Sequence, residues 1–144
     1  MHIEVDQSGK IEQLDRDTVI AFSNDYQYSI FIPRKVKQEF YRLYRVRIKH
    51  LRYKLFVIGI YYCLRDYFRL NELILIDCEY SGKENLIKSL LLNLFRKYHL
   101  INPKIIHFGT IGKRSNAHAA AIDVFRENRK PNFTLSLKDI ENLL

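Results

Sequence analysis

Three acidic residues occupy positions where a carboxylate could do chemistry. Asp6 ends a short alternating stretch, and Asp77 and Glu79 lie around the end of the apolar run Leu73–Cys78. Residues two apart in a strand share one face, so Asp77 and Glu79 should point the same way. A carboxylate buried without a partner is costly, and Mg²⁺ and Mn²⁺ prefer oxygen ligands. The acids therefore predict a divalent-metal site, with turn, cap or surface roles as the plainer alternative.

Positive charge is concentrated in one segment. The chain has a net charge of +8, and residues 34–54 hold nine basic residues and one acidic residue. Four of the nine recur at helical spacing and predict one basic stripe: Arg42, Arg45, Lys49 and Arg52. With few acidic partners, such a stripe suits the phosphate backbone of DNA or RNA, and the plainer alternative is a solvated helix face.

A glycine-containing loop at 109–115 precedes an alanine-rich segment. The loop lacks the full spacing of a phosphate-binding loop, but it brings two glycines and two cations to the amino end of an expected helix. We therefore predict Lys113 and Arg114 as phosphate contacts, with an ordinary glycine turn as the alternative. A nucleotide-binding or protein-assembly domain that uses this loop is a further hypothesis.

Hydrophobic periodicity predicts the elements that position these residues. Strands are expected at 3–6, 18–23, 28–32, 73–78 and 104–108. Helices are expected from Pro33 to about Tyr62 with one break near 44–47, after Ser81 with a capping box to Glu84, at 116–126, and in a short final segment capped by Ser136 and Asp139. The order predicts an α/β fold whose antiparallel strands precede parallel strands joined by helical crossovers.

Size and composition indicate one domain spanning residues 1–144. Cys63 and Cys78 lie in apolar runs and are expected to be buried free thiols. The longest apolar run, Leu55–Leu64, is about half as long as a membrane span. We therefore expect a cytoplasmic protein with no membrane partner, and a homodimer is compatible with the sequence.

This arrangement resembles the ribonuclease H-like superfamily, which includes Holliday-junction resolvases and the catalytic domains of transposases and integrases. The resemblance covers most of the chain, because both show three antiparallel strands, a helix, a parallel strand, a helix, another parallel strand and a helix. In that superfamily one acid lies on the first strand and another ends the fourth, and Asp6 and Asp77 match those places.

The resemblance also implies an acid or a histidine on the last helix. The segment from Asn116 to Asp123 is similar to the resolvase branch, although resolvases place the acid three residues after the histidine, where this chain has Ala121. The sequence leaves open whether His118 or Asp123 completes the site.

A metal-dependent nuclease is the function that the resemblance implies. Phosphodiester hydrolysis would use two Mg²⁺ or Mn²⁺ ions held by Asp6, Asp77, Glu79 and Asp123, with His118 as a further catalytic candidate. The alternative is a non-catalytic nucleic-acid-binding module on the same fold, in which the acids are structural.

Overall fold

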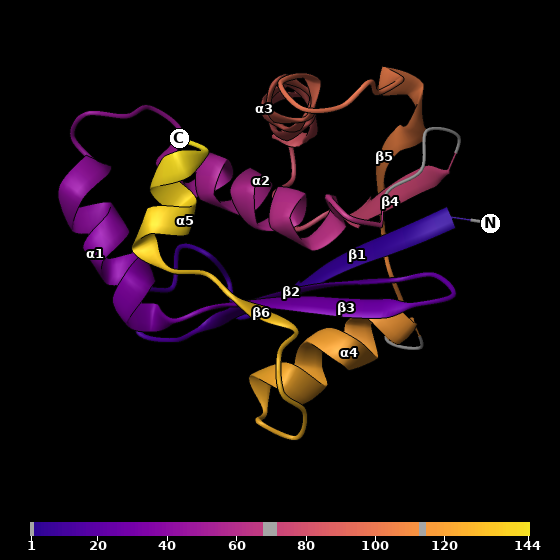
Figure 1. The fold of residues 1–144 in the computed structure, drawn as a ribbon, viewed down its shortest axis with the longest axis horizontal. Coiled ribbons are helices and arrows are strands. Elements are labelled where there is room, and N and C mark those ends of the chain that lie inside the picture. Colours follow the sequence, from indigo (N-terminus) through magenta and orange to yellow (C-terminus); the bar gives the residue numbers. More distant parts are fainter. Residues whose placement is uncertain (1, 68–71, 113–114) are drawn as a thin grey trace.

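One six-stranded mixed sheet organises the chain in the computed structural model, which describes residues 2–67, 72–112 and 115–144 (Figure 1). The strands are β1 (His2–Ser8), β2 (Thr18–Ser23), β3 (Gln27–Ile32), β4 (Leu73–Asp77), β5 (Ile106–Gly109) and β6 (Phe133–Thr134), in the spatial order β5-β4-β1-β2-β3-β6. The helices are α1 (Arg34–Tyr44), α2 (Leu51–Leu64), α3 (Glu84–Arg96), α4 (Asn116–Phe125) and α5 (Leu137–Asn142), and a 3₁₀ turn covers Pro103–Ile105. The fold is therefore α/β, as predicted.

Strand direction decides which side chains meet. β1, β2 and β3 pair antiparallel, whereas β4 pairs parallel with β1 on one side and with β5 on the other. The carboxyl ends of β1, β4 and β5 consequently lie at one edge of the sheet. Val5 pairs with Ile76, so the next residues, Asp6 and Asp77, lie side by side on the neighbouring strands β1 and β4.

Helices cover both faces of the sheet, with α2 and α3 on one side and α4 on the other (Figure 1). Ile3 and Val5 of β1 belong to the larger core, which includes α2 and α3 residues. Alternation turns Asp6 to the other face. There Val19 and Ala21 of β2 pack against small residues of α4, including Ala120 and Ala121. Asp6 therefore faces α4, which carries His118.

The predicted basic helix is two helices. α1 ends at Tyr44 and α2 begins at Leu51, with His50 in a left-handed backbone conformation at φ 58° before α2. Arg42 belongs to α1, Arg45 caps its end, Lys49 lies in the connection and Arg52 belongs to α2. The prediction of one basic stripe along a helix is therefore wrong. The predicted break near residues 44–47 is a connection from α1 to α2, in which the chain changes direction.

Smaller expectations had mixed outcomes. The final helix has the predicted capping box between Ser136 and Asp139. At α3 the N-cap is Lys83 instead of the predicted Ser81.

Both cysteines are free. Cys63 is buried as predicted, but Cys78 is partly exposed and its thiol donates to Glu84 Oε1 at 2.9 Å. Within the described part of the chain, no helix is long and apolar enough to cross a membrane.

Lys37, one of the basic residues of the charged segment, is fully buried. Its Nζ donates to Lys10 O at 3.2 Å, Gln13 O at 2.7 Å and Thr18 Oγ1 at 3.0 Å. Burial lowers the pKa of this ammonium group to about 8. Lys37 therefore ties α1 to the β1–β2 connection, which begins three residues after Asp6.

Replacing Lys37 with Met should lower the free energy of unfolding by about 2–4 kcal/mol, because buried acceptors lose their donor. Chemical denaturation would measure the loss. Lys35→Met is the matched control, since Lys35 is exposed on the same helix and its replacement should cost less than about 0.5 kcal/mol. Equal losses in both variants would contradict the anchoring role of Lys37.

Candidate metal centre

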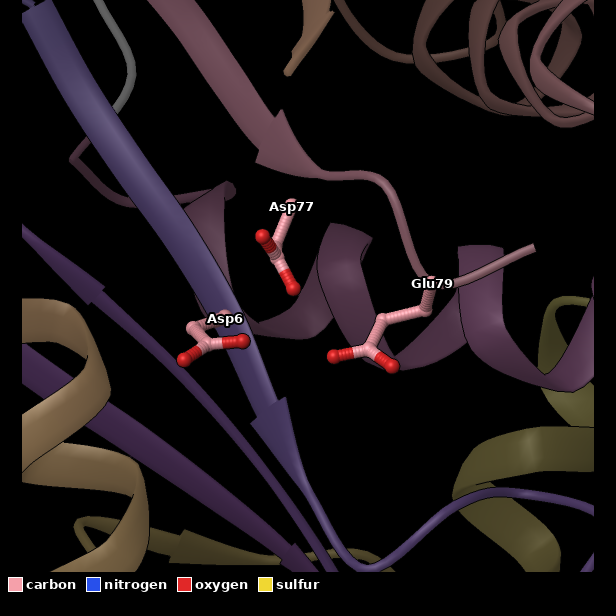
Figure 2. Close-up of side chains that lie close together, drawn as sticks. All are labelled: Asp6, Asp77 and Glu79. Carbon is pink, nitrogen blue, oxygen red and sulfur yellow. The ribbon is translucent and has the colours of Figure 1, made fainter. Parts of the chain in front are cut away.

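Three carboxylates converge at the shared carboxyl edge of β1 and β4 (Figure 2). Asp6 comes from β1 and is 4% exposed, Asp77 is the last residue of β4, and Glu79 follows two residues later. One oxygen from each carboxylate lies within 4.8 Å of the others. Parallel pairing with a two-residue period explains why Asp6 and Asp77 share a face.

Hydrogen bonds fix two of the three acids. Asp6 Oδ1 accepts from the backbone N–H of Gln7 at 2.8 Å, and Asp6 Oδ2 lies 2.8 Å from His118 Nδ1. Asp77 Oδ1 accepts from the backbone N–H of Ile111 at 2.8 Å, which joins β4 to the connection after β5. Two carboxylates are thus oriented before any ligand arrives, which limits the ordering that binding must bring about.

Crowding of negative charge raises the proton affinity of the site. Burial raises the pKa of Asp6, the hydrogen bond from His118 opposes this shift, and the nearby Asp77 charge adds to it. Burial together with the hydrogen bond and charge of Asp77 raises the pKa of Glu79 to about 7, and Lys10 acts in the opposite direction. Near neutral pH the cluster is therefore partly protonated, and a bound cation would displace the proton.

The donor set fits a hard divalent cation. All three groups offer oxygen, the ligand type that Mg²⁺ and Mn²⁺ prefer. Oxygens on one octahedral Mg²⁺ lie ~3 Å apart when neighbouring and ~4.2 Å apart when opposite, so the three carboxylates would draw closer together around an ion. Asp6, Asp77 and Glu79 would hold the ion, which matches three of the four metal ligands expected from the sequence.

His118, rather than Asp123, is the α4 residue that the structure brings to the acids. His118 contacts Asp6, whereas the Asp123 carboxylate lies 3.4 Å from Arg129 Nη2 and its side chain is 40% exposed. The two residues are five positions apart on a helix with about 3.6 residues per turn, so they point in different directions. The expectation that Asp123 joins the metal ligands is therefore corrected, because among the described residues the cluster consists of Asp6, Asp77 and Glu79.

The predicted nucleic-acid contacts are dispersed. Arg42 forms an ion pair with Glu39 on α1, and its Nε lies 3.0 Å from Glu39 Oε2. Arg45 and Lys49 are exposed, and Arg52 lies beside Glu12 with 3.7 Å between Nη1 and Oε2. The predicted contacts Lys113 and Arg114 lie outside the described residues.

Sequence reasoning missed residues in the connections around the acids. Lys10, in the connection after β1, is close enough for its charge to lower the pKa of Glu79. Tyr80 follows Glu79 directly, and its hydroxyl lies 3.4 Å from Glu12 Oε1 and 3.3 Å from Gln7 Nε2. The available signal was that Lys10 follows Asp6 by four residues and Tyr80 follows Glu79 directly, because residues after parallel strands gather at the same edge.

Comparison with known proteins identified no match for this chain. No protein-family model matches the chain, and neither do any curated protein sequences or solved structures.

Affinity for Mn²⁺ should increase when the pH is raised from about 6 to about 8. The raised pKa of Glu79, about 7, means that an ion must displace a proton below that pH but not above it. Affinity should rise by up to ~10-fold per pH unit below 7 and then level off. Calorimetric titrations in buffers of different ionisation enthalpy would measure the released proton.

Glu79→Gln is the control for this pH dependence. It removes the titrating carboxylate, so the variant should bind Mn²⁺ more weakly and with a flatter pH profile. Equal affinity of the unaltered protein at both ends of the pH range would contradict the assignment of Glu79 as a ligand that must lose a proton.

Proposed function

We propose that this protein is a divalent-metal-dependent nuclease with a ribonuclease H-like fold. The observation that carries the proposal is the convergence of Asp6, Asp77 and Glu79, with one oxygen of each within 4.8 Å of the others. The contact from His118 of α4 to Asp6 supports it, because the resemblance implies an acid or a histidine on the last helix of the fold.

The order of elements also supports the fold assignment. Three antiparallel strands come first, followed by helices and then by β4, α3, β5 and α4, with β4 and β5 parallel to β1. The pair α1 and α2 stands where the resemblance implies one helix, and β6 and α5 are additions at the end of the chain. Asp6 and Asp77 lie on the first and fourth strands, as the resemblance implies.

The residues of the site have separable roles in the proposed reaction. A bound Mg²⁺ or Mn²⁺ would supply an activated water and neutralise charge on the phosphodiester. Asp6 and Asp77 would offer carboxylate oxygens to the ion from positions that hydrogen bonds fix, and His118 orients Asp6 through Nδ1. Glu79 would complete the set of oxygen ligands once the ion has displaced its proton.

Basic residues would hold the nucleic acid beside this centre. Lys10 acts on the charge of Glu79, and the exposed residues Arg45, Lys49 and Arg52 lie between the end of α1 and the start of α2. These groups would neutralise backbone phosphates without reading sequence, so binding should weaken as salt increases. DNA and RNA are both substrates that this chemistry accommodates.

Cleavage of labelled nucleic acids at low salt tests the proposal. Single-stranded DNA, duplex DNA, four-way junctions, RNA and RNA–DNA hybrid would each be incubated with Mg²⁺ or Mn²⁺. Cleavage that EDTA prevents and that Mn²⁺ restores is the expected result. Binding without cleavage on every substrate would overturn the nuclease and favour a non-catalytic module that uses the basic residues alone.

A further inference from the structure

A chain of polar contacts leads from the candidate metal centre to Arg52. Gln7 and Tyr80, the neighbours of Asp6 and Glu79, come together where Gln7 Nε2 donates to the Tyr80 hydroxyl at 3.3 Å. That hydroxyl donates to Glu12 Oε1 at 3.4 Å, and the other Glu12 oxygen lies 3.7 Å from Arg52 Nη1. Contacts of Gln7, Tyr80 and Glu12 therefore connect Arg52 to the residues that directly follow Asp6 and Glu79 in the chain.

Aromatic packing holds this end of the site in place. Arg52 lies over the ring of Tyr53, 5.7 Å from its centroid, and Tyr53 meets Tyr80 edge to face at 5.5 Å between centroids. Tyr80 also packs edge to face on Phe56 of α2 and is 9% exposed. Because Tyr80 is buried, its hydroxyl is a fixed anchor, and Glu12 is held beside the guanidinium of Arg52.

The contact between Glu12 and Arg52 is weak enough to be exchanged. It spans 3.7 Å, and the Arg52 side chain is 46% exposed against 26% for Glu12. An ion pair with this much exposure to water contributes little net free energy. A guanidinium, in contrast, can bind a phosphate through two parallel hydrogen bonds. A phosphodiester group that reaches Arg52 would therefore compete with Glu12 and bind more strongly.

We propose that Arg52 binds a backbone phosphate of the substrate and that Glu12 sets its affinity by competing for the guanidinium. This inference rests on the proposed nuclease function. Glu12 is a specificity-determining residue in this scheme, because it screens Arg52 against isolated phosphate. A nucleic-acid strand that is bound at the same time by the metal centre and the other basic residues has enough binding energy to displace the Glu12 carboxylate from Arg52.

A double-mutant cycle tests the competition. Dissociation constants of a labelled single-stranded oligonucleotide would be measured with Ca²⁺ at several salt concentrations for Glu12→Gln, Arg52→Gln and the double variant. Glu12→Gln should bind about two- to fivefold more tightly, the range in which an exposed ion pair contributes. Arg52→Gln should bind more weakly, with a salt slope reduced by about 0.7. Glu12→Gln should have no effect when Arg52 is already replaced.

Steady-state cleavage with Mn²⁺ separates this role from a structural one. Glu12→Gln should lower KM by the same about two- to fivefold factor, because the change acts on binding. Gln keeps an oxygen that can accept from Tyr80, so thermal unfolding should confirm an intact fold. A fall in kcat with an unaltered KM would overturn the inference.

Asp15→Asn is the matched control for removal of negative charge. Asp15 lies in the same connection as Glu12, its side chain is 74% exposed, and its neighbour is Arg16 at 3.6 Å. If Asp15→Asn tightens binding as much as Glu12→Gln does, or if Glu12→Gln still acts without Arg52, general electrostatics explains the effect and the inference is wrong. Absence of metal-dependent cleavage in the unaltered protein would instead overturn the proposed function, and absence of strand binding would overturn both.

Discussion

Asp77→Asn is expected to reduce metal-dependent cleavage by at least about 10²–10³-fold while the fold and nucleic-acid binding persist. The substitution removes the charged ligand at the end of β4 but keeps an oxygen that can accept from Ile111 N–H. The connection after β5 should therefore stay in place. Cleavage and filter binding of the same labelled substrate would measure the two effects separately.

The same substitution should make the metal-free protein more stable. Asp77 raises the pKa of both Asp6 and Glu79, so its charge opposes the ionised form of each. A carboxyl group whose pKa is raised by folding binds more protons in the folded state than in the unfolded state. For Glu79 this destabilises the fold as pH rises from about 4.5 to about 7, and the destabilisation remains above that range.

Asp77→Asn should therefore raise the free energy of unfolding by about 1 kcal/mol at pH 8 without metal. Mn²⁺ should stabilise the unaltered protein more than the variant, because the variant has lost a ligand. Loss of activity with a gain of stability is the pattern of a functional site and differs from that of a damaged core. Lower stability of Asp77→Asn without metal would contradict the charge crowding.

Asp123→Asn is the matched control, since it makes the same chemical change on α4. The Asp123 carboxylate contacts Arg129 in a half-exposed ion pair, so its loss should change stability by less than about 1 kcal/mol and activity by less than about twofold. Activity abolished by Asp123→Asn and retained by Asp77→Asn would overturn the assignment of the metal centre.

The strands that carry the acids were predictable from short-range patterns. Alternation around Val5 and the apolar run before Asp77 identified β1 and β4, and the carboxyl edge of parallel strands follows from their direction. Convergence of Asp6, Asp77 and Glu79 could thus be expected from the sequence. The choice between His118 and Asp123 depended on the rotation of α4 about its axis, which is set by packing of its alanines on β2.

Other features depend on tertiary structure that local patterns do not encode. Apolar spacing continues across the connection between α1 and α2, and the turn there uses His50 at a positive φ without glycine or proline. Lys37 looks like a surface cation in a basic segment, but its three acceptors come from residues about 19–27 positions earlier in the chain. β6 has two residues, too few to show a period.

Gly9→Ala should lower the free energy of unfolding by about 3–5 kcal/mol, which for a chain of this size lowers the melting temperature by roughly 10 °C. Gly9 has φ 75°, and a Cβ there would lie 2.1 Å from the backbone oxygen of Asp17 and 2.7 Å from Phe125 Cε2. Asp17 also accepts from Arg34 N–H at 2.7 Å. Displacing Asp17 would therefore disturb the start of α1 as well as the connection that carries Lys10.

Gly82→Ala separates backbone strain from crowding, because Gly82 has φ 82° and nothing lies within 4 Å of the added Cβ. Strain alone should cost about 1 kcal/mol. Chemical denaturation of both variants gives the difference, which measures how tightly Gly9 is enclosed between Asp17 and Phe125 of α4. Equal losses would mean that the connection relaxes around the new methyl group, and Lys10 and Glu12 would then not be held rigidly beside the metal centre.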